Sequence, residues 1–389
     1  MNIILRDGNA YEHLKPFTFT RPVSEIRIGI LTISEKYSRR GLEVSWYTQE
    51  YLSVKYPMVI KDVNVVVDAS ICPTDIFVDA LSNLKPGQGI TIHGSLVAGC
   101  ITADQNISNF EESVKETFEF KVSLTQINRL WHIFQFNGTE LNNDFELLTR
   151  GRTSAGLSST NKIIGDKIFV EEGVWAECAV FNTTTGPIYL GKDVTVMEGV
   201  LVRGALAMGE HSQLNMGAKI YGPTTLGPYC KVGGEVNNSV LFGYSNKGHE
   251  GFLGNSVLGE WCNIGADTNN SNLKNNYDEV KLWNYALGSF ERTGLQFCGL
   301  FMGDHSKCGI NTMFNTGTVV GVSANIFGSG FPRNFIPSFS WGGAQGMTEY
   351  KLEKALETAS RVMARRKKEL DGIETDILTR VYELTKEYR

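Results

Sequence analysis

Apolar residues recur at every sixth position through the middle of the chain, and this spacing predicts a hexapeptide β-helix. The first run is Leu190, Val196, Val202, Met208, Leu214, Ile220, Leu226 and Val232. Neither an α-helix nor a flat strand repeats every six residues, so three short strands should make each triangular coil. The first residue of each hexapeptide is then expected to point into the prism.

Glycine follows several of these apolar residues, at the point where the chain has to turn a corner. The glycines in that position are Gly191, Gly209, Gly227 and Gly233. A residue without a Cβ relieves the steric cost of a sharp bend. The same register returns at Leu258, Ile264, Met302, Cys308, Phe314, Val320 and Ile326. We therefore predict a parallel β-helix over residues 161–340.

The segments before and after the β-helix have other patterns. Residues 1–150 are predicted to form a mixed α/β domain, and the small, polar residues from 151 to 160 a linker. The strands expected there are Asn2–Leu5, Val63–Val67 and one or two within Gly89–Ile101, and the helices are Ser24–Arg39 and Pro73–Leu84. Residues 347–389 are predicted to be helical, with Thr348 as N-cap and a division at Asp371-Gly372. This tail is expected to shield the last coil; the alternative is that it binds a separate partner.

Composition narrows the class of protein. The formal net charge of −5 argues against a nucleic-acid binder, and no apolar stretch is long enough to span a membrane. No basic segment followed by an apolar one opens the chain, so no secretory signal is expected. Seven cysteines without a CxxC pair are typical of buried apolar residues in a reducing compartment. We predict a cytoplasmic protein without nucleic-acid or membrane partners.

The period of six fails in two places, from Gly234 to Phe252 and from Thr268 to Phe301. Insertions in a solenoid emerge as loops on one face, which is often the binding face. In the first break, glycines flank His249, whose imidazole could accept a proton from a nucleophile; the alternative is a histidine that caps a loop. The second break combines several Asn residues with Lys274, which suits a sugar phosphate; the alternative is a solvated loop with Asn in turns.

A family resemblance begins in the first break and extends into the second. Its residues are Lys247-Gly248-His249, then Leu253-Gly254, Leu258-Gly259, Asn263 to Ala266 and finally Asn272. In type and spacing they resemble the acetyltransferase half of the bifunctional N-acetylglucosamine-1-phosphate uridylyltransferase and glucosamine-1-phosphate acetyltransferase family. The resemblance implies a left-handed β-helix and acetyl-CoA as acyl donor. It implies His249 as general base and Asn272 as its ordering or substrate partner.

The chain departs from the family pattern at positions that contact substrate. Phe252 stands where the family has a tyrosine, and Asp278 where it has a lysine, whose role would pass to Lys274 or Lys281. Lys247 and Phe252 join Asn272 and Lys274 as expected substrate-binding residues. A family serine near the acetyl-CoA site falls on Ile310. The family also implies a homotrimer, with each active site between neighbouring prisms.

The N-terminal segment His13 to Pro22 resembles a stretch of sugar-1-phosphate nucleotidyltransferases. These enzymes cradle a nucleoside triphosphate in a Gly-rich loop, whereas only Asp7-Gly8 precedes the segment here. We expect Asp7, Gly8 and Arg21 to contact nucleotide; the alternative for Arg21 is a salt bridge that fixes the following turn. Nucleotidyl transfer would need Mg²⁺, and Asp144 is the candidate ligand.

Three functional hypotheses follow. The first is a transferase that acetylates an amino-sugar 1-phosphate such as glucosamine 1-phosphate, with or without coupled nucleotidyl transfer to UDP-N-acetylglucosamine. The second is a sugar-1-phosphate uridylyl- or thymidylyltransferase whose β-helix serves as a trimerisation scaffold. The third is a catalytically inactive protein that binds sugar nucleotides. Sugar phosphates and nucleotides are the small-molecule partners in all three.

Overall fold

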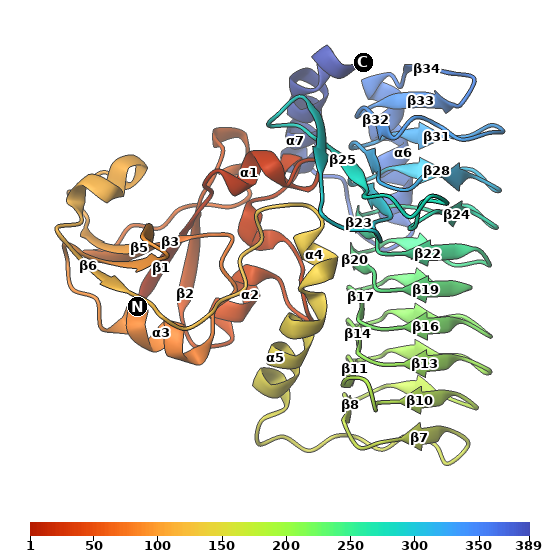
Figure 1. Cartoon of the computed structure of the whole chain (residues 1–389), viewed down its shortest axis with the longest axis horizontal. Helices are drawn as coiled ribbons and strands as arrows, with labels where there is room; N and C mark the ends of the chain where they lie inside the picture. Colours follow the sequence, from red (N-terminus) through yellow and green to blue (C-terminus); the bar gives the residue numbers. More distant parts are fainter. The chain divides into compact units, whose positions relative to one another are not determined.

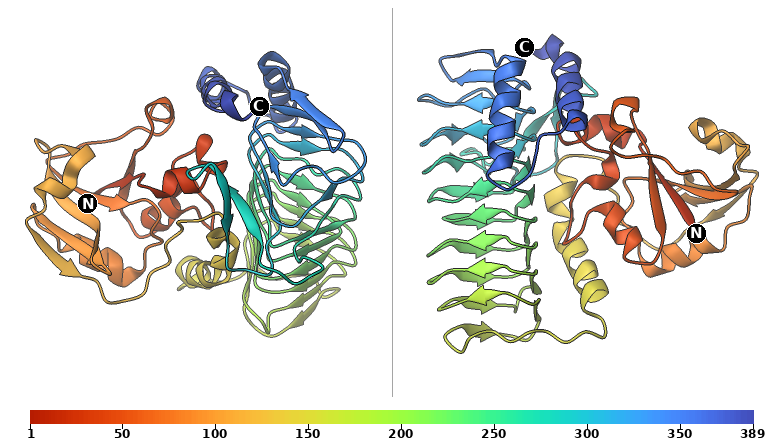
Figure 2. Two further views of the ribbon diagram at one scale, coloured as in Figure 1. Left: turned by 45° about the horizontal axis from the view of Figure 1, so that its top comes forward. Right: turned by 180° about the vertical axis from the view of Figure 1, so that it is seen from behind.

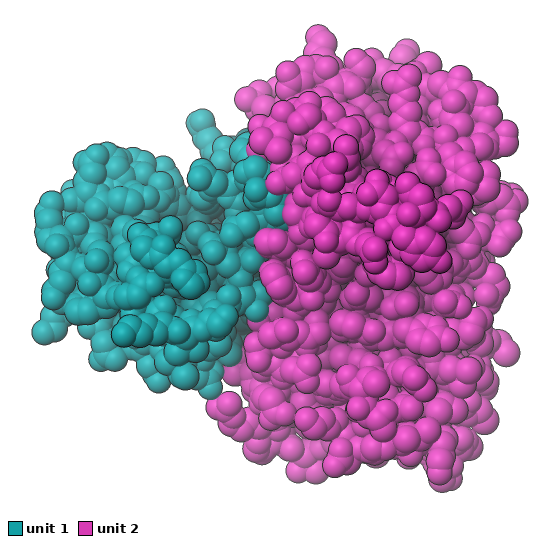
Figure 3. Space-filling model, in the orientation of Figure 1, with its two compact units in different colours: residues 1–14, 21–26, 31–129 teal, residues 15–20, 27–30, 130–389 magenta.

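The computed structural model describes residues 1–389 as two compact units, which Figure 3 distinguishes by colour. Unit 1 consists of Met1–Leu14, Arg21–Ile26 and Leu31–Arg129. Unit 2 consists of Lys15–Thr20, Arg27–Ile30 and Leu130–Arg389. Two short N-terminal segments therefore belong to the same unit as the C-terminal two thirds of the chain. Residues 130–150 also lie in unit 2, so the boundary predicted at residue 150 is wrong.

Unit 1 is built on a six-stranded sheet in the order β2-β1-β3-β5-β4-β6. Its strands are β1 (Asn2–Arg6), β2 (Glu43–Tyr47), β3 (Val63–Asp68), β4 (Gln88–Ile92), β5 (Ser95–Thr102) and β6 (Glu116–Glu119). Its helices are α1 (Ala10–His13), α2 (Ile33–Ser38) and α3 (Asp75–Ser82). Strands β2, β1 and β3 run parallel, so the ends of their apolar runs lie at one edge of the sheet.

Most elements predicted in this part of the chain are confirmed, but the helix over Ser24–Arg39 is wrong. Only a single 3₁₀ turn, Val23–Glu25, and the short helix α2 form there. Between them, the N–H groups of Gly29 and Ile30 donate to the side chains of Asn137 and Asp144. These donors are thereby unavailable for helical hydrogen bonds, which the local pattern could not reveal.

Unit 2 contains a parallel β-solenoid with three faces (Figure 1). The first face consists of β7 (Lys162–Ile164), β10 (Val180–Asn182), β13 (Leu201–Arg203), β16 (Lys219–Tyr221), β19 (Glu235–Asn237) and β22 (Phe252–Gly254), followed by β24 (Asn269–Asn270) and β29 (Met313–Phe314). The second face consists of β8 (Ile168–Val170), β11 (Ile188–Leu190), β14 (Leu206–Met208), β17 (Thr224–Leu226), β20 (Val240–Gly243), β23 (Val257–Glu260), β27 (Leu300–Met302), β30 (Thr318–Val320) and β32 (Phe335–Ile336). The third face consists of β9 (Trp175–Ala176), β12 (Thr195–Val196), β15 (Gln213–Leu214), β18 (Lys231–Val232), β21 (Asn246–Lys247), β28 (Lys307–Cys308), β31 (Asn325–Ile326), β33 (Ser340–Gly343) and the antiparallel β34 (Gly346–Glu349).

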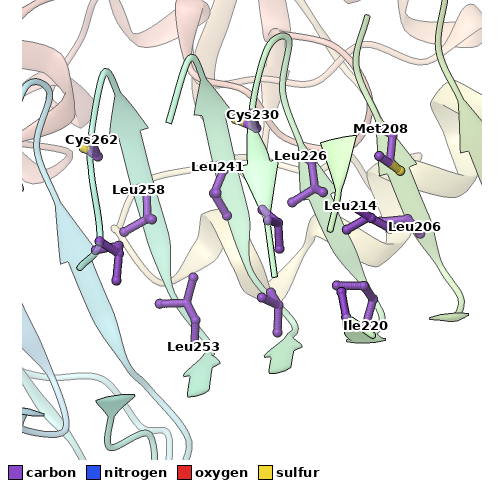
Figure 4. Packing of buried hydrophobic residues seen from close by; sticks show 14 of the residues in the cluster. Leu206, Met208, Leu214, Ile220, Leu226, Cys230, Leu241, Leu253, Leu258 and Cys262 are labelled. Atoms are coloured by element: carbon purple, nitrogen blue, oxygen red, sulfur yellow. The ribbon is translucent and has the colours of Figure 1, made fainter. Parts of the chain in front are cut away.

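The interior of the solenoid confirms the period-six pattern. Every apolar residue of the two periodic runs is buried in one continuous core cluster. Figure 4 shows part of this cluster, in which equivalent side chains of successive coils stack on one another, as Met208 and Leu226 do. Burial of this kind contributes roughly 1.5–3 kcal/mol for each large aliphatic side chain.

The first break in the period is not an insertion, contrary to the prediction. Strands β19, β20 and β21 continue all three faces through it, and Val236 pairs with Ile220 on one side and Leu253 on the other. The coil is simply shorter at its corners, so the inward positions no longer fall every sixth residue. Lys247 occupies one of these positions, paired with Val232.

The second break does contain an insertion. After β24, the chain leaves the coil as the antiparallel hairpin of β25 (Lys281–Asn284) and β26 (Ser289–Arg292). It returns so that Asn270 of β24 pairs with Phe314 of β29. The hairpin stacks Trp283 on Phe335 with ring centroids 4.2 Å apart, so it is packed against the last coils.

Helices α4 (His132–Gln135) and α5 (Asn137–Thr149) run beside the second face (Figure 1). Thr225, on the outer side of β17, donates its hydroxyl to the Gly29 carbonyl at 2.8 Å. Phe17 packs on Phe242 with ring centroids 5.0 Å apart. The second face is therefore covered by other segments of unit 2.

The C-terminal tail forms α6 (Leu352–Ala364) and α7 (Gly372–Leu384), as the division at Asp371-Gly372 predicted. The predicted cap at Thr348 is wrong. Thr348 lies in β34, where it pairs with Trp341 of β33, and α6 starts only after Lys351. Helix α6 runs along several coils (Figure 2), while Tyr382 of α7 packs edge-on against Phe339 near the last coil. None of these helices is long and apolar enough to cross a membrane.

Candidate active site beside helix α6

His249 lies on the corner between β21 and β22, and its side chain is exposed. Two side-chain donors hold the backbone of this corner. Asn215 donates its amide to the Gly248 carbonyl at 2.6 Å, and Lys247 donates its ammonium to the His249 carbonyl at 2.5 Å. A Cβ on Gly233 would lie 2.6 Å from the Gly248 oxygen, so a glycine is needed below the corner. The imidazole is thus presented from a fixed backbone.

Lys247 does not face a substrate, contrary to its predicted role. Its side chain points into the prism and only 1 % of the residue is exposed. Burial lowers the pKa of Lys247 to about 8. Because its ammonium is bonded to the His249 carbonyl, Lys247 supports the histidine from inside.

His249 lines a cleft of about 820 Å³ between the third face and α6. The other residues around it are Asn215, Lys231, Tyr244, Asn246, Gly248, Trp261, Cys262, Asn263, Ile264, Gly265, Ala266, Lys307, Ile310, Thr358, Val362, Arg365 and Arg366. The size is typical of a site for a small molecule. Ile310, at the position of the family serine, lies on the rim and is 69 % exposed.

Four cationic side chains surround the cleft, namely Lys231, Lys307, Arg365 and Arg366. Burial, together with the nearby Arg366 and Arg365, lowers the pKa of Lys231. Burial also lowers the pKa of Lys307 to about 8, and its ammonium donates to the His305 carbonyl at 2.7 Å. Positive charge is therefore concentrated around a concave surface that also holds a histidine.

Two aromatic side chains of a longer stack of rings, Tyr244 and Trp261, line one side of the cleft. Tyr229 stacks on Tyr244 with ring centroids 5.1 Å apart, and Tyr244 on Trp261 with centroids 4.2 Å apart. Each of these residues turns the same corner of a successive coil with a positive φ. The stack offers a flat, partly apolar surface next to the cations.

Asn272 and Phe252 lie together, but not with His249. The amide nitrogen of Asn272 and the ring of Phe252 both approach the position that a Cβ on Gly254 would take. Asn272 donates to the Asn255 side chain at 2.8 Å. His249 precedes β22 and Asn255 follows it, so one strand of the first face separates them. The predicted pairing of His249 with Asn272 is thus not formed within one chain.

Lys274 belongs to the insertion that follows β24. Its ammonium donates to the Glu279 carbonyl at 2.6 Å and lies 3.8 Å from the Asp278 carboxylate. These contacts hold the start of the hairpin. The structure does not bring Lys274 into the cleft of His249.

In unit 1, Asp7 and Gly8 directly follow β1, and Arg21 precedes the 3₁₀ turn. Asp7 accepts hydrogen bonds from the Val23 N–H at 2.8 Å and from the Thr48 hydroxyl at 2.6 Å. Burial, with a smaller contribution from Asp68, raises the pKa of Asp7 to about 7. Both oxygens of this carboxylate are therefore used to hold the loops after β1 and β2.

Gly8 and Arg21 differ in accessibility. Gly8 is exposed, with open space where a Cβ would be. Arg21 is only 5 % exposed, and its charge acts on the buried carboxylate of Glu25. This proximity favours the alternative in which Arg21 fixes the turn.

Asp68, at the end of β3, is a residue that the sequence reasoning missed. It accepts from the Ser70 hydroxyl at 2.6 Å and from the Gln126 amide at 3.2 Å. The signal was available, since an acidic residue directly after a buried parallel strand falls at the edge of the sheet where ligands bind.

Asp144 lies on α5 in unit 2 and accepts from the Ile30 N–H at 2.8 Å. No group of three or more His, Cys, Asp or Glu side chains is arranged to hold a metal ion. With both Asp7 oxygens engaged as well, the residues present do not fit a two-carboxylate magnesium centre.

The cationic residues of the cleft were also missed. Arg365 and Arg366 open a basic run in the tail, and Lys231 and Lys307 are outward neighbours of inward positions on the third face. The period could have located the two lysines. It gave no indication that the tail would lie beside them.

Solved structures to which the chain is similar include a UDP-N-acetylglucosamine acyltransferase from Arabidopsis. The identity is 15 %, with 55 % of this chain and 80 % of that chain covered and a TM-score of 0.26. A mutant perosamine N-acetyltransferase from Caulobacter crescentus, in complex with CoA and GDP-perosamine, is 12 % identical, with 84 % of this chain and 94 % of that one covered and a TM-score of 0.13. No curated protein sequence matches.

One family model matches the N-terminal part of the chain. It is described as sugar nucleotidyl transferase, and residues 3–153 match it. The chain therefore combines a nucleotidyltransferase-like N-terminal domain with a parallel β-solenoid and a helical C-terminal tail.

Proposed function

We propose that the protein is an acyltransferase that acetylates an amino-sugar phosphate, with acetyl-CoA as donor and His249 as general base. The observation that carries this proposal is the exposed imidazole on a fixed corner inside a cationic cleft of about 820 Å³. Phosphate groups on both substrates suit the four cations around it.

The chemistry follows from the position of the imidazole. His249 takes a proton from the sugar amine as the amine nitrogen attacks the thioester carbonyl. The tetrahedral oxyanion is stabilised by main-chain N–H groups of a neighbouring coil. The C–S bond then breaks, the amide forms, and the proton leaves with the coenzyme A thiol.

Release of free thiol tests this proposal. The protein is incubated with acetyl-CoA and glucosamine 1-phosphate, or with other amino-sugar phosphates, and thiol is measured. His249→Ala should lower the rate about 10²–10⁴-fold, the usual contribution of a general base. His211→Ala is the matched control, because His211 is an exposed histidine on an earlier coil outside the cleft. No thiol release with any of these acceptors, or equal loss in both variants, would contradict the proposal.

The family match of residues 3–153 supports a second candidate, binding or transfer of a nucleotide by unit 1. Asp7 and Asp68 stand at the carboxyl ends of β1 and β3, where open α/β sheets bind ligands. Pyrophosphate release from UTP and N-acetylglucosamine 1-phosphate tests transfer. Arg21→Ala should reduce that release if Arg21 contacts the nucleotide, whereas Arg21→Lys should keep part of it.

The proposal extends to the oligomeric state of the protein and to its location in the cell. We propose a homotrimer in the cytoplasm, in which each solenoid uses faces that its own helices leave open. Light scattering of the purified protein measures the number of copies, and a monomer would contradict the trimer.

A further inference from the structure

The cleft that holds His249 has its second wall in the same chain. Thr358, Val362, Arg365 and Arg366, from α6 and the residues that follow it, line this wall. Arg366 also donates to the Tyr229 carbonyl at 3.3 Å and to the Asn246 side chain at 3.1 Å. These bonds join the end of α6 to two successive coils, so the wall is attached to the solenoid (Figure 2).

The cations on the two walls are not neutralised by the protein. None of Lys231, Lys307, Arg365 and Arg366 forms an ion pair with a carboxylate. By contrast, Arg361 on the same helix pairs with Glu357. Guanidinium groups next to ammonium groups, without a carboxylate, are suited to bind phosphate through charge-assisted hydrogen bonds.

The same cleft offers a surface for a flat ring. Tyr244 and Trp261 both line it, and their rings are stacked at 4.2 Å with an angle of 12° between their planes. Because stacking covers the faces of both rings and Trp261 is only 7 % exposed, the rings present their edges to the cleft. The face of a nucleoside base can pack against such edges while its phosphates reach the cations. Charge and aromatic surface together therefore fit a nucleoside diphosphate group.

We propose that helix α6, and not a second copy of the chain, forms the other wall of the His249 site, where Arg365 and Arg366 bind the pyrophosphate of a nucleoside-containing ligand. This inference rests on the proposed acyl transfer for the identity of the site. Coenzyme A and a sugar nucleotide both contain a nucleoside and a pyrophosphate group. The inference departs from the family arrangement, in which the site lies between neighbouring prisms.

Calorimetric titration with coenzyme A and, separately, with UDP tests the ligand without any turnover. The double variant Arg365→Ala, Arg366→Ala should weaken binding at least tenfold, and Arg361→Ala should not change it. Binding of coenzyme A alone, UDP alone or both supports the site and names the source of the phosphates. Binding of neither, or equal binding by the two variants and the wild type, overturns the inference. Thermal melts identify any loss of folding in the double variant, and Arg365→Lys, Arg366→Lys then replaces it.

Mixed assemblies test which chain supplies the wall. His249→Ala and the double arginine variant are co-expressed with different tags, and the species carrying both tags is isolated. If each site lies within one chain, the mixture shows no more thiol release than its two parents. Recovery of activity above both parents means that the walls come from different copies and overturns the inference. A fully active monomer supports it directly. If thiol release fails even in the wild type, the proposed acyl transfer fails, while the titration still decides the binding site.

Discussion

At the scale of the residue, the sequence predicted the role of some neighbours of His249 but not of others. Its flanking glycines stand beside it in the chain, and they predicted an exposed imidazole. Lys247 was expected to bind substrate, because nothing in its type indicates an inward side chain. Its position inside the prism became visible only through the pairing with Val232 across a shortened coil.

The buried ammonium of Lys247 predicts an unusual dependence of stability on pH. Its pKa is about 8 in the folded protein, against about 10.4 for an exposed lysine. Between these values the unfolded chain binds more protons, so the free energy of unfolding rises with pH. From pH 7 to pH 9.5 the gain should be about 2 kcal/mol from this group. Urea unfolding at both pH values should show a smaller gain in Lys247→Met. An identical gain in the variant and the wild type would show that Lys247 is not the cause.

The pKa of Asp7 is raised, whereas that of Lys247 is lowered, so Asp7 gives the opposite dependence of stability on pH. Burial raises its pKa to about 7, so the folded state binds more protons than the unfolded state from about pH 4 to pH 7. Stability contributed by protonated Asp7 is therefore present at low pH and lost as pH rises through 7. Asp7→Asn should match or exceed the wild type at pH 8 in urea unfolding, whereas Asp7→Ala should lose about 1–3 kcal/mol because buried donors lose their acceptor. An Asn variant as unstable at pH 8 as the Ala variant would contradict this account.

At the scale of the element, the solenoid was predictable because each coil repeats the same inward positions. The helix predicted over Ser24–Arg39 does not form. Gly29 and Ile30 are bonded to Asn137 and Asp144, more than 100 residues away. Likewise, Thr348 lies in β34 because it pairs with Trp341 of β33. A local pattern cannot contain partners that only the tertiary structure supplies.

The corner of His249 gives a prediction at this scale. A Cβ at Gly233 would come within 2.6 Å of the Gly248 carbonyl, so Gly233→Ala should displace the corner and lower thiol release at least tenfold. Gly156→Ala is the control, because nothing lies within 4 Å of its Cβ position. The kinetics of both variants are measured along with their melting temperatures. Full activity of Gly233→Ala would show that the corner need not be fixed.

At the scale of the whole molecule, the sequence indicated an N-terminal domain, a solenoid and a tail. It did not show that Lys15–Thr20 and Arg27–Ile30 belong to the solenoid unit. Phe17 packs on Phe242, and Thr20 donates to the Asp304 carboxylate at 2.7 Å. The candidate cleft was missed for the same reason, since α6 and the third face are distant in sequence.

The packing of these segments predicts which unit is destabilised by a substitution in its core. Phe17→Ala should destabilise unit 2 by about 3–5 kcal/mol. Hydrogen exchange should then accelerate in β17–β23 but not in β1–β3. Phe77→Ala, in the core of unit 1 against Phe120 at 5.2 Å, should have the reverse effect. Faster exchange in β1–β3 of the Phe17 variant would mean that Phe17 supports unit 1 instead.

His249 is proposed to act as the base of an acyl transfer, and the rate of that transfer is the most direct measurement of this role. Single-turnover kinetics with acetyl-CoA and an amino-sugar phosphate should show thiol release and acetylated sugar in equal amounts. His249→Ala should slow both about 10²–10⁴-fold while coenzyme A still binds. Acetylation at the wild-type rate without the imidazole would contradict the central claim.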